Sequence, residues 1–471
     1  MKKLFISLLV FTALALSAQE KTNVILFLVD DLGYHDLGIT GSELYETPNI
    51  DALAESGMSF DNAYASHPRC VPSRYGIQTG KYPARGHVPG GKGSLKVEDY
   101  TIGEAFNEAG YTTFFAGKWH LGKNEKEWPQ NQGYDYNVAG CSAGAPISYF
   151  YPYNVKSDKK DKSNHKRIVG LEEGEEGEYL TDRLTDETVQ FIMEHKDEPF
   201  FAMLSHYGVH TPFQAKEEII RKYKKKVKTL TFDGPELIDK DGQTKMYQDN
   251  AVYAAMIESV DESLGKIIET LKATGLMENT VIVFTSDHGG LSNRGINNNR
   301  RLATSNLPLR AGKGHLLEGG IRVPFIVYWP GNVAPGSTSG QVTVNIDIYP
   351  TLLEIAGIQN QNKDIDGISI VPSLKAENSV ERTLFWHSPL ARPSSTGDRN
   401  STAVRQGDYK LVDWYDDGMV GLYNLKEDIS EANDLSEKMP EKTAEMLGLI
   451  NNWRKKVNAI TVDTVNNRWY K

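Results

Sequence analysis

The strongest constraint on the fold is a series of short apolar segments that alternate with stretches of helical pattern. Residues 23–29, NVILFLV, form a continuous apolar run after Asn23, which is typical of a strand buried on both faces of a sheet. Further strands are predicted at residues 111–117, 199–205, 280–286 and 323–329. This order of strands and helices predicts an α/β fold with a doubly wound, mostly parallel sheet.

Helices are predicted between these strands from their end signals and apolar periodicity. The first has Thr47 in the cap position, Pro48 in the first turn and Gly57 at its end. The predicted helices are residues 47–57, 101–110, 181–195, 246–273 and 346–357. Two charged insertions, 155–178 and 216–245, are predicted to be surface loops.

The pattern changes near residue 373. The segments RTLFWHS, STAVRQGDYKLVDWY and GLYNL are typical of short antiparallel strands, and an amphipathic helix is predicted at 440–458. A chain of 471 residues is long for one core. We therefore expect a large domain over residues 19–372 and a smaller C-terminal α+β subdomain with an antiparallel sheet over residues 373–471.

The first 18 residues have the pattern of a secretory signal peptide. Lys2 and Lys3 precede an apolar run, and Ala18 stands before a plausible cleavage site. The run is short for a bilayer span, and no later stretch reaches that length. We expect an exported protein, periplasmic or secreted, without a transmembrane segment.

The net charge is −10, and cleavage after Ala18 would remove two lysines and no acids, which gives −12. Such acidity argues against a nucleic-acid partner, which would need a basic face. It does not exclude an anionic substrate, because a local group of cations can outweigh the overall charge.

Polar residues directly follow four of the predicted strands. They are Asp30-Asp31, Lys118 to His120, His206 to His210, and Asp287-His288. Ligands bind beyond the carboxyl ends of the strands in such sheets, so all four groups are expected on one rim.

Asp30, Asp31 and Asp287 form the acidic part of this rim. Three carboxylates repel one another unless a cation lies between them. Their hard oxygen atoms favour Ca²⁺ or Mg²⁺ over Zn²⁺. A single aspartate at a strand end is more often a helix cap, so the predicted metal site depends on their convergence.

The rim also carries cationic or titratable groups. They are Lys118, His120, His210 and Lys313, with Arg74 one helical turn after Cys70. This set suits the transfer of an anionic group, because fixed cations stabilise the charge that develops on it.

The segment Cys70-Val71-Pro72-Ser73-Arg74 is identical to the Cys-x-Pro-Ser-Arg signature of the type I sulfatases. Other segments resemble sulfatase sequences in the family's order. They are NVILFLVDDLGYHDLG, TPNIDALAESG, GYTTFFAGKWHLG, SHYGVHTPF, VIVFTSDHGG, AGKGHLLEGGIRVP and AVRQGDYKL. The resemblance implies an alkaline phosphatase-like α/β/α sandwich and a catalytic sulfatase domain over residues 19–372.

The resemblance also implies that a maturation enzyme oxidises Cys70 to formylglycine (3-oxoalanine). One hydroxyl of the hydrated aldehyde then attacks sulfur, and the alcohol leaves from the opposite side. The second hydroxyl loses its proton, sulfate is expelled and the aldehyde returns, which is covalent catalysis with a built-in exit. Cys141 is then expected to be a small buried residue and not a disulfide partner.

The roles that the resemblance implies divide the rim in two. The metal ligands would be Asp30, Asp31, Cys70, Asp287 and His288, and the catalytic residues would be Cys70, Arg74, Lys118, His120, His210 and Lys313. The cation is expected to be Ca²⁺. Mg²⁺ and Mn²⁺ stay as alternatives, because many sulfatases have asparagine in place of His288 and imidazole is a poor calcium ligand.

Substrate contacts are predicted at four polar positions near the rim: His35, Arg301, Asn306 and Arg310. The arginine fork suits a carboxylate or a second sulfate on a sugar. The predicted substrate is a sulfated algal polysaccharide of the ulvan or carrageenan type, with glycosaminoglycans as an alternative. Two other functions stay open, a phosphate or phosphonate monoester hydrolase on the same fold and a catalytically silent glycan-binding relative.

Overall fold

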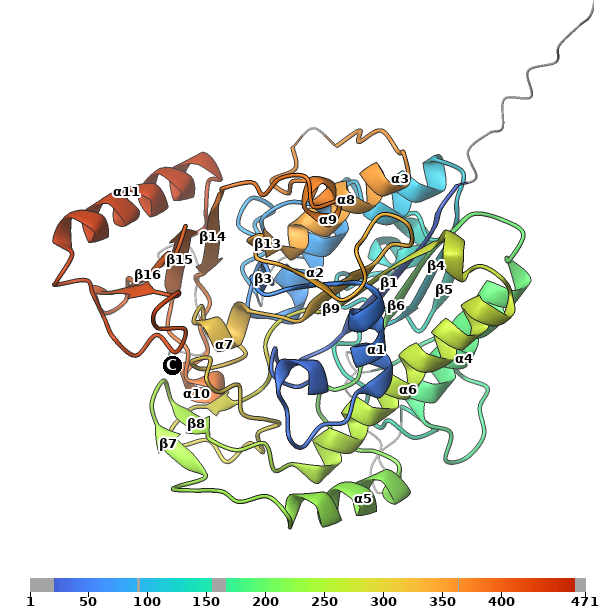
Figure 1. The fold of residues 1–471 in the computed structure, drawn as a ribbon, viewed down its shortest axis with the longest axis horizontal. Helices are drawn as coiled ribbons and strands as arrows, with labels where there is room; N and C mark the ends of the chain where they lie inside the picture. The colour runs from blue at the N-terminus through green and yellow to red at the C-terminus, as the bar shows by residue number, and fades with distance from the viewer. Residues whose placement is uncertain (1–20, 91–93, 155–166, 363, 462–471) are drawn as a thin grey trace, which may run out of the picture.

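A large central sheet organises the molecule (Figure 1). The computed structural model describes residues 21–90, 94–154, 167–362 and 364–461. In spatial order the eight strands are β12 (Ser337–Ser339), β2 (Met58–Phe60), β11 (Phe325–Tyr328), β9 (Thr280–Ser286), β1 (Asn23–Val29), β6 (Phe200–Ser205), β4 (Thr112–Gly117) and β5 (Tyr136–Val138). Only β11 runs antiparallel to its neighbours in this sheet. The predicted α/β class with a mostly parallel sheet is confirmed.

The sheet separates two hydrophobic cores. Alternate residues of β1 point to opposite faces, so that Ile25 and Phe27 enter one core while Val24 and Leu26 enter the other. This double burial explains why the strand is apolar from Val24 onward.

Helices cover both faces of the sheet (Figure 1). The first face carries α1 (Pro48–Ser56), α4 (Leu180–Glu194), α5 (Glu217–Val227) and α6 (Ala251–Ala273). The second carries α2 (Cys70–Thr79), α3 (Ile102–Glu108) and α8 (Ile348–Ile355). The α/β/α sandwich positions the carboxyl ends of β1, β4, β6 and β9 beside one another.

Two predictions differ from the structure: the start of the long helix α6 and the loop predicted at 216–245. Helix α6 begins at Ala251 and not near residue 246, because the Asn250 side chain accepts a hydrogen bond from the Tyr253 N–H at 3.3 Å and caps the helix. The insertion 216–245 is not a loop. It forms α5 and a hairpin of β7 (Leu237–Asp239) and β8 (Gln243–Lys245).

The prediction failed at α5 because charge hides its apolar face. Ile219, Ile220 and Tyr223 are buried at helical spacing among lysines that face solvent. Strand β8 also pairs with β10 (Asn293–Arg294), which ties this insertion to the segment after β9. The other insertion, 155–178, is described from residue 167 onward, and those described residues form a loop.

The C-terminal region forms a four-stranded antiparallel sheet with one helix. The strands are β14 (Thr383–Ser388), β15 (Ser401–Gln406), β16 (Tyr409–Trp414) and β17 (Met419–Asn424), and α11 (Pro440–Lys456) packs on them. Figure 1 shows this unit beside the main sheet. The antiparallel sheet confirms the predicted architecture, whereas the boundary at residue 372 stays a prediction.

A buried ionic cluster joins the two parts. Lys410 Nζ on β16 lies 2.8 Å from Glu318 Oε1 and 2.9 Å from Glu431 Oε1, and all three side chains are inaccessible to solvent. Glu431 Oε2 also accepts the N–H of Glu318 at 2.7 Å. Glu318 begins α7 (Glu318–Ile321), a few residues after Lys313, so the cluster anchors one side of the predicted rim.

The expected signal peptide, residues 1–18, lies outside the described residues. Within the described part of the chain, no helix combines the length and apolar character that crossing a bilayer requires. Cys70 and Cys141 are both buried and neither is in a disulfide, and Cys141 is the small buried residue that was expected.

Candidate active site

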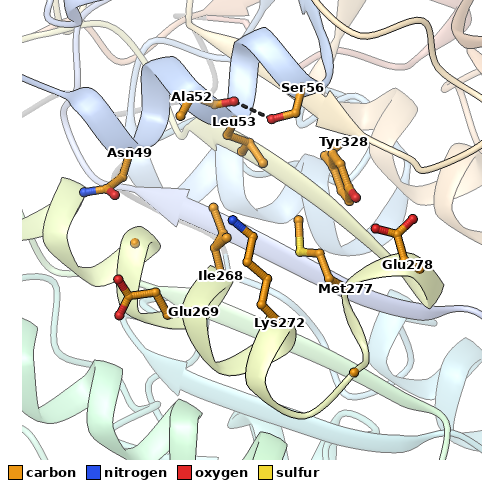
Figure 2. A pocket seen from close by; sticks show the side chains of 12 residues that line it. Asn49, Ala52, Leu53, Ser56, Ile268, Glu269, Lys272, Met277, Glu278 and Tyr328 are labelled. Atoms are coloured by element: carbon orange, nitrogen blue, oxygen red, sulfur yellow. Dashed lines mark hydrogen bonds between the residues drawn. The ribbon is translucent and has the colours of Figure 1, made fainter.

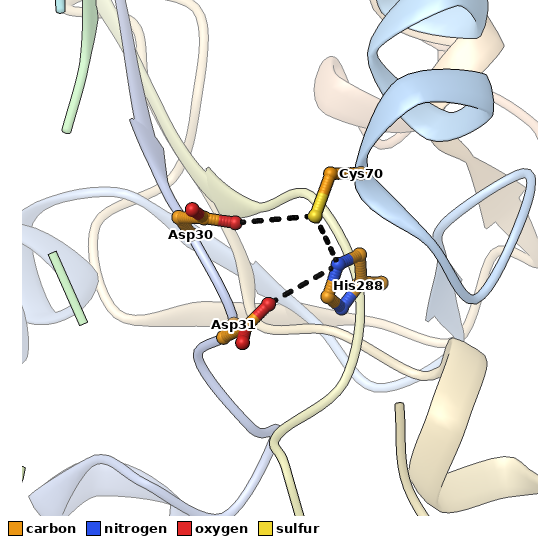
Figure 3. Close-up of side chains that lie close together, drawn as sticks. All are labelled: Asp30, Asp31, Cys70 and His288. Carbon is orange, nitrogen blue, oxygen red and sulfur yellow. Dashed lines mark hydrogen bonds and ion pairs between the residues drawn. The ribbon is translucent and has the colours of Figure 1, made fainter. Parts of the chain in front are cut away.

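The structure brings the predicted rim residues together around Cys70. Asp30 and Asp31 follow β1, His288 follows β9, and Cys70 opens α2. One potential ligand atom from each of these four buried residues lies within 4.8 Å of all the others (Figure 3). Strands far apart in the sequence thus deliver a compact group of carboxylate, thiol and imidazole side chains.

Backbone conformation lets two adjacent aspartates face one centre. Side chains of neighbouring strand residues normally point to opposite faces. Asp31, however, has a φ of +65°, in the left-handed region that aspartate tolerates better than most residues. Its N–H donates to Asp287 Oδ1 at 3.2 Å, which fixes the turn.

His288 is held so that one ring nitrogen faces the cluster. Its Nδ1 lies 3.0 Å from the carbonyl oxygen of Gly289, to which it can only donate, so Nδ1 carries a proton. Its Nε2 lies 3.3 Å from Asp31 Oδ1 and 3.2 Å from Cys70 Sγ. Burial lowers the pKa of His288, but the charges of Asp287, Cys70 and Asp31 outweigh burial and raise it.

Arg74 joins three segments of the site through hydrogen bonds. Its Nε donates to Asp287 Oδ2 at 2.9 Å, and its Nη1 donates to the Lys118 carbonyl and to Ser205 Oγ, both at 2.7 Å. Its Nη2 lies 3.6 Å from Asp30 Oδ1 and makes no hydrogen bond within the described chain. The role of Ser205 was missed in the sequence, although a polar residue that ends an apolar strand marks it.

Two lysines oppose the buried carboxylates. Lys118 Nζ pairs with Asp30, and Lys313 Nζ lies 2.6 and 2.8 Å from the two oxygens of Asp31. Burial raises the pKa of Asp30 well above its ordinary value, with Lys118 opposing and Asp287 adding to the rise. Burial acts in the same direction on Asp31, but Lys313 and the nearby histidines prevail and lower its pKa.

The same charged side chains also change the pKa of the Cys70 thiol. Burial alone would raise the pKa of Cys70, but Lys118, Lys313 and His288 lower it well below its ordinary value. The site therefore favours negative charge at residue 70.

His210 lies beside Asp31. Its Nε2 lies 3.8 Å from Asp31 Oδ2, and its Nδ1 donates to the Thr211 carbonyl at 2.7 Å.

His120 adjoins Cys70 in a tightly fitted position. It has a φ of +59°, its N–H donates to the Cys141 carbonyl at 3.0 Å, and the charge of Cys70 acts on its ring. A Cβ atom on Gly144 would come within 2.4 Å of the ring, so only glycine fits there. Burial lowers the pKa of His120, which keeps the ring neutral and able to accept a proton.

The donor set fits a divalent cation. Each ionised carboxylate offers about four lone-pair positions, so the pairing of Asp30 and Asp31 with lysines leaves further positions available. His288 Nε2 has the tautomer that a ligand needs, because Nδ1 is the protonated nitrogen. The raised pKa of Asp30 also reflects like charges that a cation would offset.

The four predicted substrate contacts are engaged within the protein. Arg310 pairs with both oxygens of Asp241 at 2.6 and 2.9 Å, and Arg301 Nη2 donates to Asn250 Oδ1 at 2.8 Å. The amide of Asn306 is buried and donates to several backbone carbonyls. The ring of His35 bonds to the Thr40 carbonyl. Their role as substrate contacts stays a prediction.

A separate surface pocket of about 500 Å³ lies between α1, α6 and β11 (Figure 2). Its polar lining includes Asn49, Lys272 and Glu278. Ser56, the serine in its lining, donates a hydrogen bond to the Ala52 carbonyl of its own helix. None of the residues that line it belongs to the Cys70 cluster, so this pocket is separate from the candidate active site.

The chain matches two protein-family models. The model described as Sulfatase matches residues 22–358, and the model described as N-sulphoglucosamine sulphohydrolase, C-terminal, matches residues 312–458. The first match covers more than half of the chain and includes the described residues of the Cys70 cluster.

Individual relatives agree with this family. A sulfatase from Formosa agariphila is 32% identical, with 94% of this chain and 90% of the relative covered. Human arylsulfatase A is 29% identical, with 86% and 77% covered. Among solved structures, Ps i-CgsB is 30% identical, with 92% and 93% covered and a TM-score of 0.76. The chain therefore belongs to the sulfatase family and is a sulfuric ester hydrolase.

Proposed function

We propose that the protein removes sulfate groups from sulfated glycans and that residue 70 acts as formylglycine, made from Cys70. One observation carries the proposal. The cysteine of the Cys-x-Pro-Ser-Arg segment opens a buried helix at the point where Asp30, Asp31 and His288 converge. A thiol in this position has no disulfide partner, and the surrounding cations suit an anionic ester.

Asp30, Asp31, Asp287 and His288 would hold one divalent cation beside residue 70, with Ca²⁺ the first choice because most donors are carboxylates. The cation supplies positive charge that offsets these carboxylates and the charge that develops on the sulfate group. Arg74 keeps Asp287 oriented through its 2.9 Å bond, and Ser205 in turn fixes the guanidinium.

The remaining side chains divide the proton transfers between them. The hydrated aldehyde of formylglycine supplies a nucleophilic hydroxyl and a second hydroxyl for the collapse step. Arg74 and Lys118 hold this hydrate, and the neutral ring of His120 takes the proton from the second hydroxyl. Lys313, and His210 once a proton is bound at Nε2, would bind sulfate oxygens and protonate the leaving alcohol.

The proposed substrate is a sulfated galactan of the carrageenan type. Ps i-CgsB, at 30% identity, has been solved in complex with k-i-k-neocarrahexaose. The curated relatives also include N-acetylgalactosamine-6-sulfatases, such as the mouse protein at 29% identity. Both substrates are sulfated sugars, which supports a carbohydrate over a simple aryl ester. The signal-like residues 1–18 support export, and a formylglycine-generating enzyme is the proposed maturation partner.

The test is turnover of matched esters by the purified, metal-loaded protein. Sulfated oligosaccharides are compared with the same sugars carrying phosphate, and released sulfate or phosphate is quantified. We expect sulfate release that exceeds phosphate release at least 100-fold. A preference for phosphate would overturn the proposal in favour of a phosphate or phosphonate monoester hydrolase.

A further inference from the structure

Arg300 stands out among the arginines near the active site. Its side chain is half-buried, yet it makes no hydrogen bond or ion pair with any residue that the structure describes. The arginines around it are all engaged: Arg294 with Gln243, Arg301 with Asn250, and Arg310 with Asp241. A guanidinium that loses part of its hydration without gaining a partner is unfavourable unless a ligand supplies one.

The backbone around Arg300 is fixed by hydrogen bonds. The Arg300 N–H donates to Asn298 Oδ1 at 2.7 Å, and its carbonyl accepts from Arg294 Nη1 at 2.9 Å. Asn298 Nδ2 also donates to the Ser394 carbonyl at 2.8 Å. The protein thus holds the base of this side chain in place while it leaves the charged end without a partner.

Contacts through α10 (Pro393–Thr396) link this segment to the catalytic cysteine. Helix α10 packs on β10, which precedes Arg300 in the chain. At the end of α10, Thr396 Oγ1 accepts a hydrogen bond from Arg69 Nη2 at 3.1 Å, and Arg69 is the neighbour of Cys70. Burial lowers the pKa of Arg300, and the charge of Asp31 opposes this effect while the charge of Arg69 adds to it. Arg300 therefore lies within electrostatic reach of the reacting centre.

A cleft adjoins the Arg300 segment. It has a volume of about 570 Å³ and is lined by Asn297, Asn298 and Asn299 on one side and by Pro393, Ser394 and Gly397 on the other, with Gly242 and Ile296 completing the lining. Amide side chains beside small residues suit hydroxyl-rich sugars, and the volume is typical of small-ligand pockets. Both halves of the chain contribute, since residues 393–397 belong to the C-terminal region.

We propose that Arg300 is a specificity residue that binds a second anionic group, a sulfate or a carboxylate, on the glycan next to the ester that is cleaved. This inference rests on the proposed glycan sulfatase function. The planar guanidinium donates two parallel hydrogen bonds to either anion, which a neutral sugar cannot accept as well. The enzyme would then prefer glycans with two neighbouring anions over glycans with one.

The test measures binding to the full chain with Cys70→Ala, which blocks turnover, in the presence of Ca²⁺. Two ligand pairs each differ by one anion. In the sulfate pair, k-i-k-neocarrahexaose is compared with the all-κ hexaose, which lacks one sulfate. In the carboxylate pair, a disaccharide of glucuronate and 6-sulfated N-acetylgalactosamine is compared with the same disaccharide carrying neutral glucose in place of glucuronate. Calorimetry gives Kd for each ligand.

We expect Arg300→Ala to weaken binding of the richer ligand about 10- to 100-fold in one pair, and of the poorer ligand less than about 2-fold. Arg300→Lys should recover part of the loss. The matched control is Arg183→Ala on α4, whose side chain pairs with Glu187 and lies outside the predicted substrate contacts, and which should affect both members of a pair equally. Thermal unfolding checks that each variant is folded.

Equal losses for both members of each pair, or no loss in either pair, would overturn the role of Arg300. The outcome is separate from that of the proposed function. If the unsubstituted enzyme releases no sulfate but Arg300 still discriminates between ligands, the proposed function fails and the binding site stands. If sulfate is released and Arg300→Ala does not discriminate, the inference alone fails.

Discussion

The buried cluster of Glu318, Lys410 and Glu431 predicts an unusual dependence of stability on pH. One ammonium group lies between two carboxylates, at 2.8 and 2.9 Å, and none of the three is exposed. Burial raises the pKa of Glu431 from 4.5 to about 7, with Lys410 opposing and Glu318 adding to the rise. Lys410 and two arginines lower the pKa of Glu318 to about 2 against its burial.

The direction in which stability changes with pH follows from the number of protons bound by the folded and unfolded states. Between pH 4.5 and about 7 the folded protein keeps a proton on Glu431 that the unfolded chain has lost, so stability falls as pH rises through this window. Each pH unit of this difference corresponds to about 1.4 kcal/mol, so Glu431 lowers the free energy of unfolding by about 3 kcal/mol. Glu318 is ionised in both states over the upper part of this window and adds no slope there, whereas near pH 4.5 it is half-protonated in the unfolded chain and opposes the trend.

The variant Glu431→Gln removes the titrating group and keeps an acceptor for the N–H of Glu318. Urea unfolding is measured at several values between pH 4.5 and pH 8 for the wild type and the variant. The stability of the variant relative to the wild type should increase by about 3 kcal/mol across this range. The exposed Glu427→Gln serves as the matched control. A constant difference between Glu431→Gln and wild type would refute the reasoning.

Three further predictions follow from the site and the fold. Chelation of the bound cation should abolish sulfate release and lower Tm, and added Ca²⁺ should restore both, whereas an unchanged Tm in a calorimetric scan would argue against the site. Arg74→Lys keeps the charge but loses the bonds to Asp287 and Ser205, so kcat should fall about 100-fold or more in steady-state assays, and an unchanged kcat would exclude a positioning role. Asn250→Ala removes the cap of α6 and should lower the free energy of unfolding by about 1 kcal/mol in urea, with no loss expected if the cap is unimportant.

The strands and the site residues at their ends were predictable because local patterns determine them. A run such as NVILFLV is read directly from the sequence, and Asp30 and Asp31 follow it at the strand end where ligands bind. Helix α5 was missed because its apolar face has few residues and lies within a strongly charged segment. Local charge outweighed periodicity in that prediction.

Whether each arginine side chain is paired was not predictable, because the pairing depends on residues distant in sequence. Arg301, Arg310 and Arg300 look equivalent in the sequence. In the structure Arg310 pairs with Asp241, 69 residues away, and Arg301 binds Asn250, 51 residues away. Only the tertiary fold shows that Arg300 is the one of the three whose charged end makes no hydrogen bond or ion pair with a described residue.

The central claim is that Cys70 is converted to formylglycine, and mass spectrometry of the peptide containing residue 70 tests it most directly. The peptide should come from active protein purified from its natural host. We predict an aldehyde at residue 70, with the sulfur replaced by oxygen and two hydrogens lost, and reaction of that peptide with a hydrazide probe. An unmodified Cys70 in fully active protein would contradict the account.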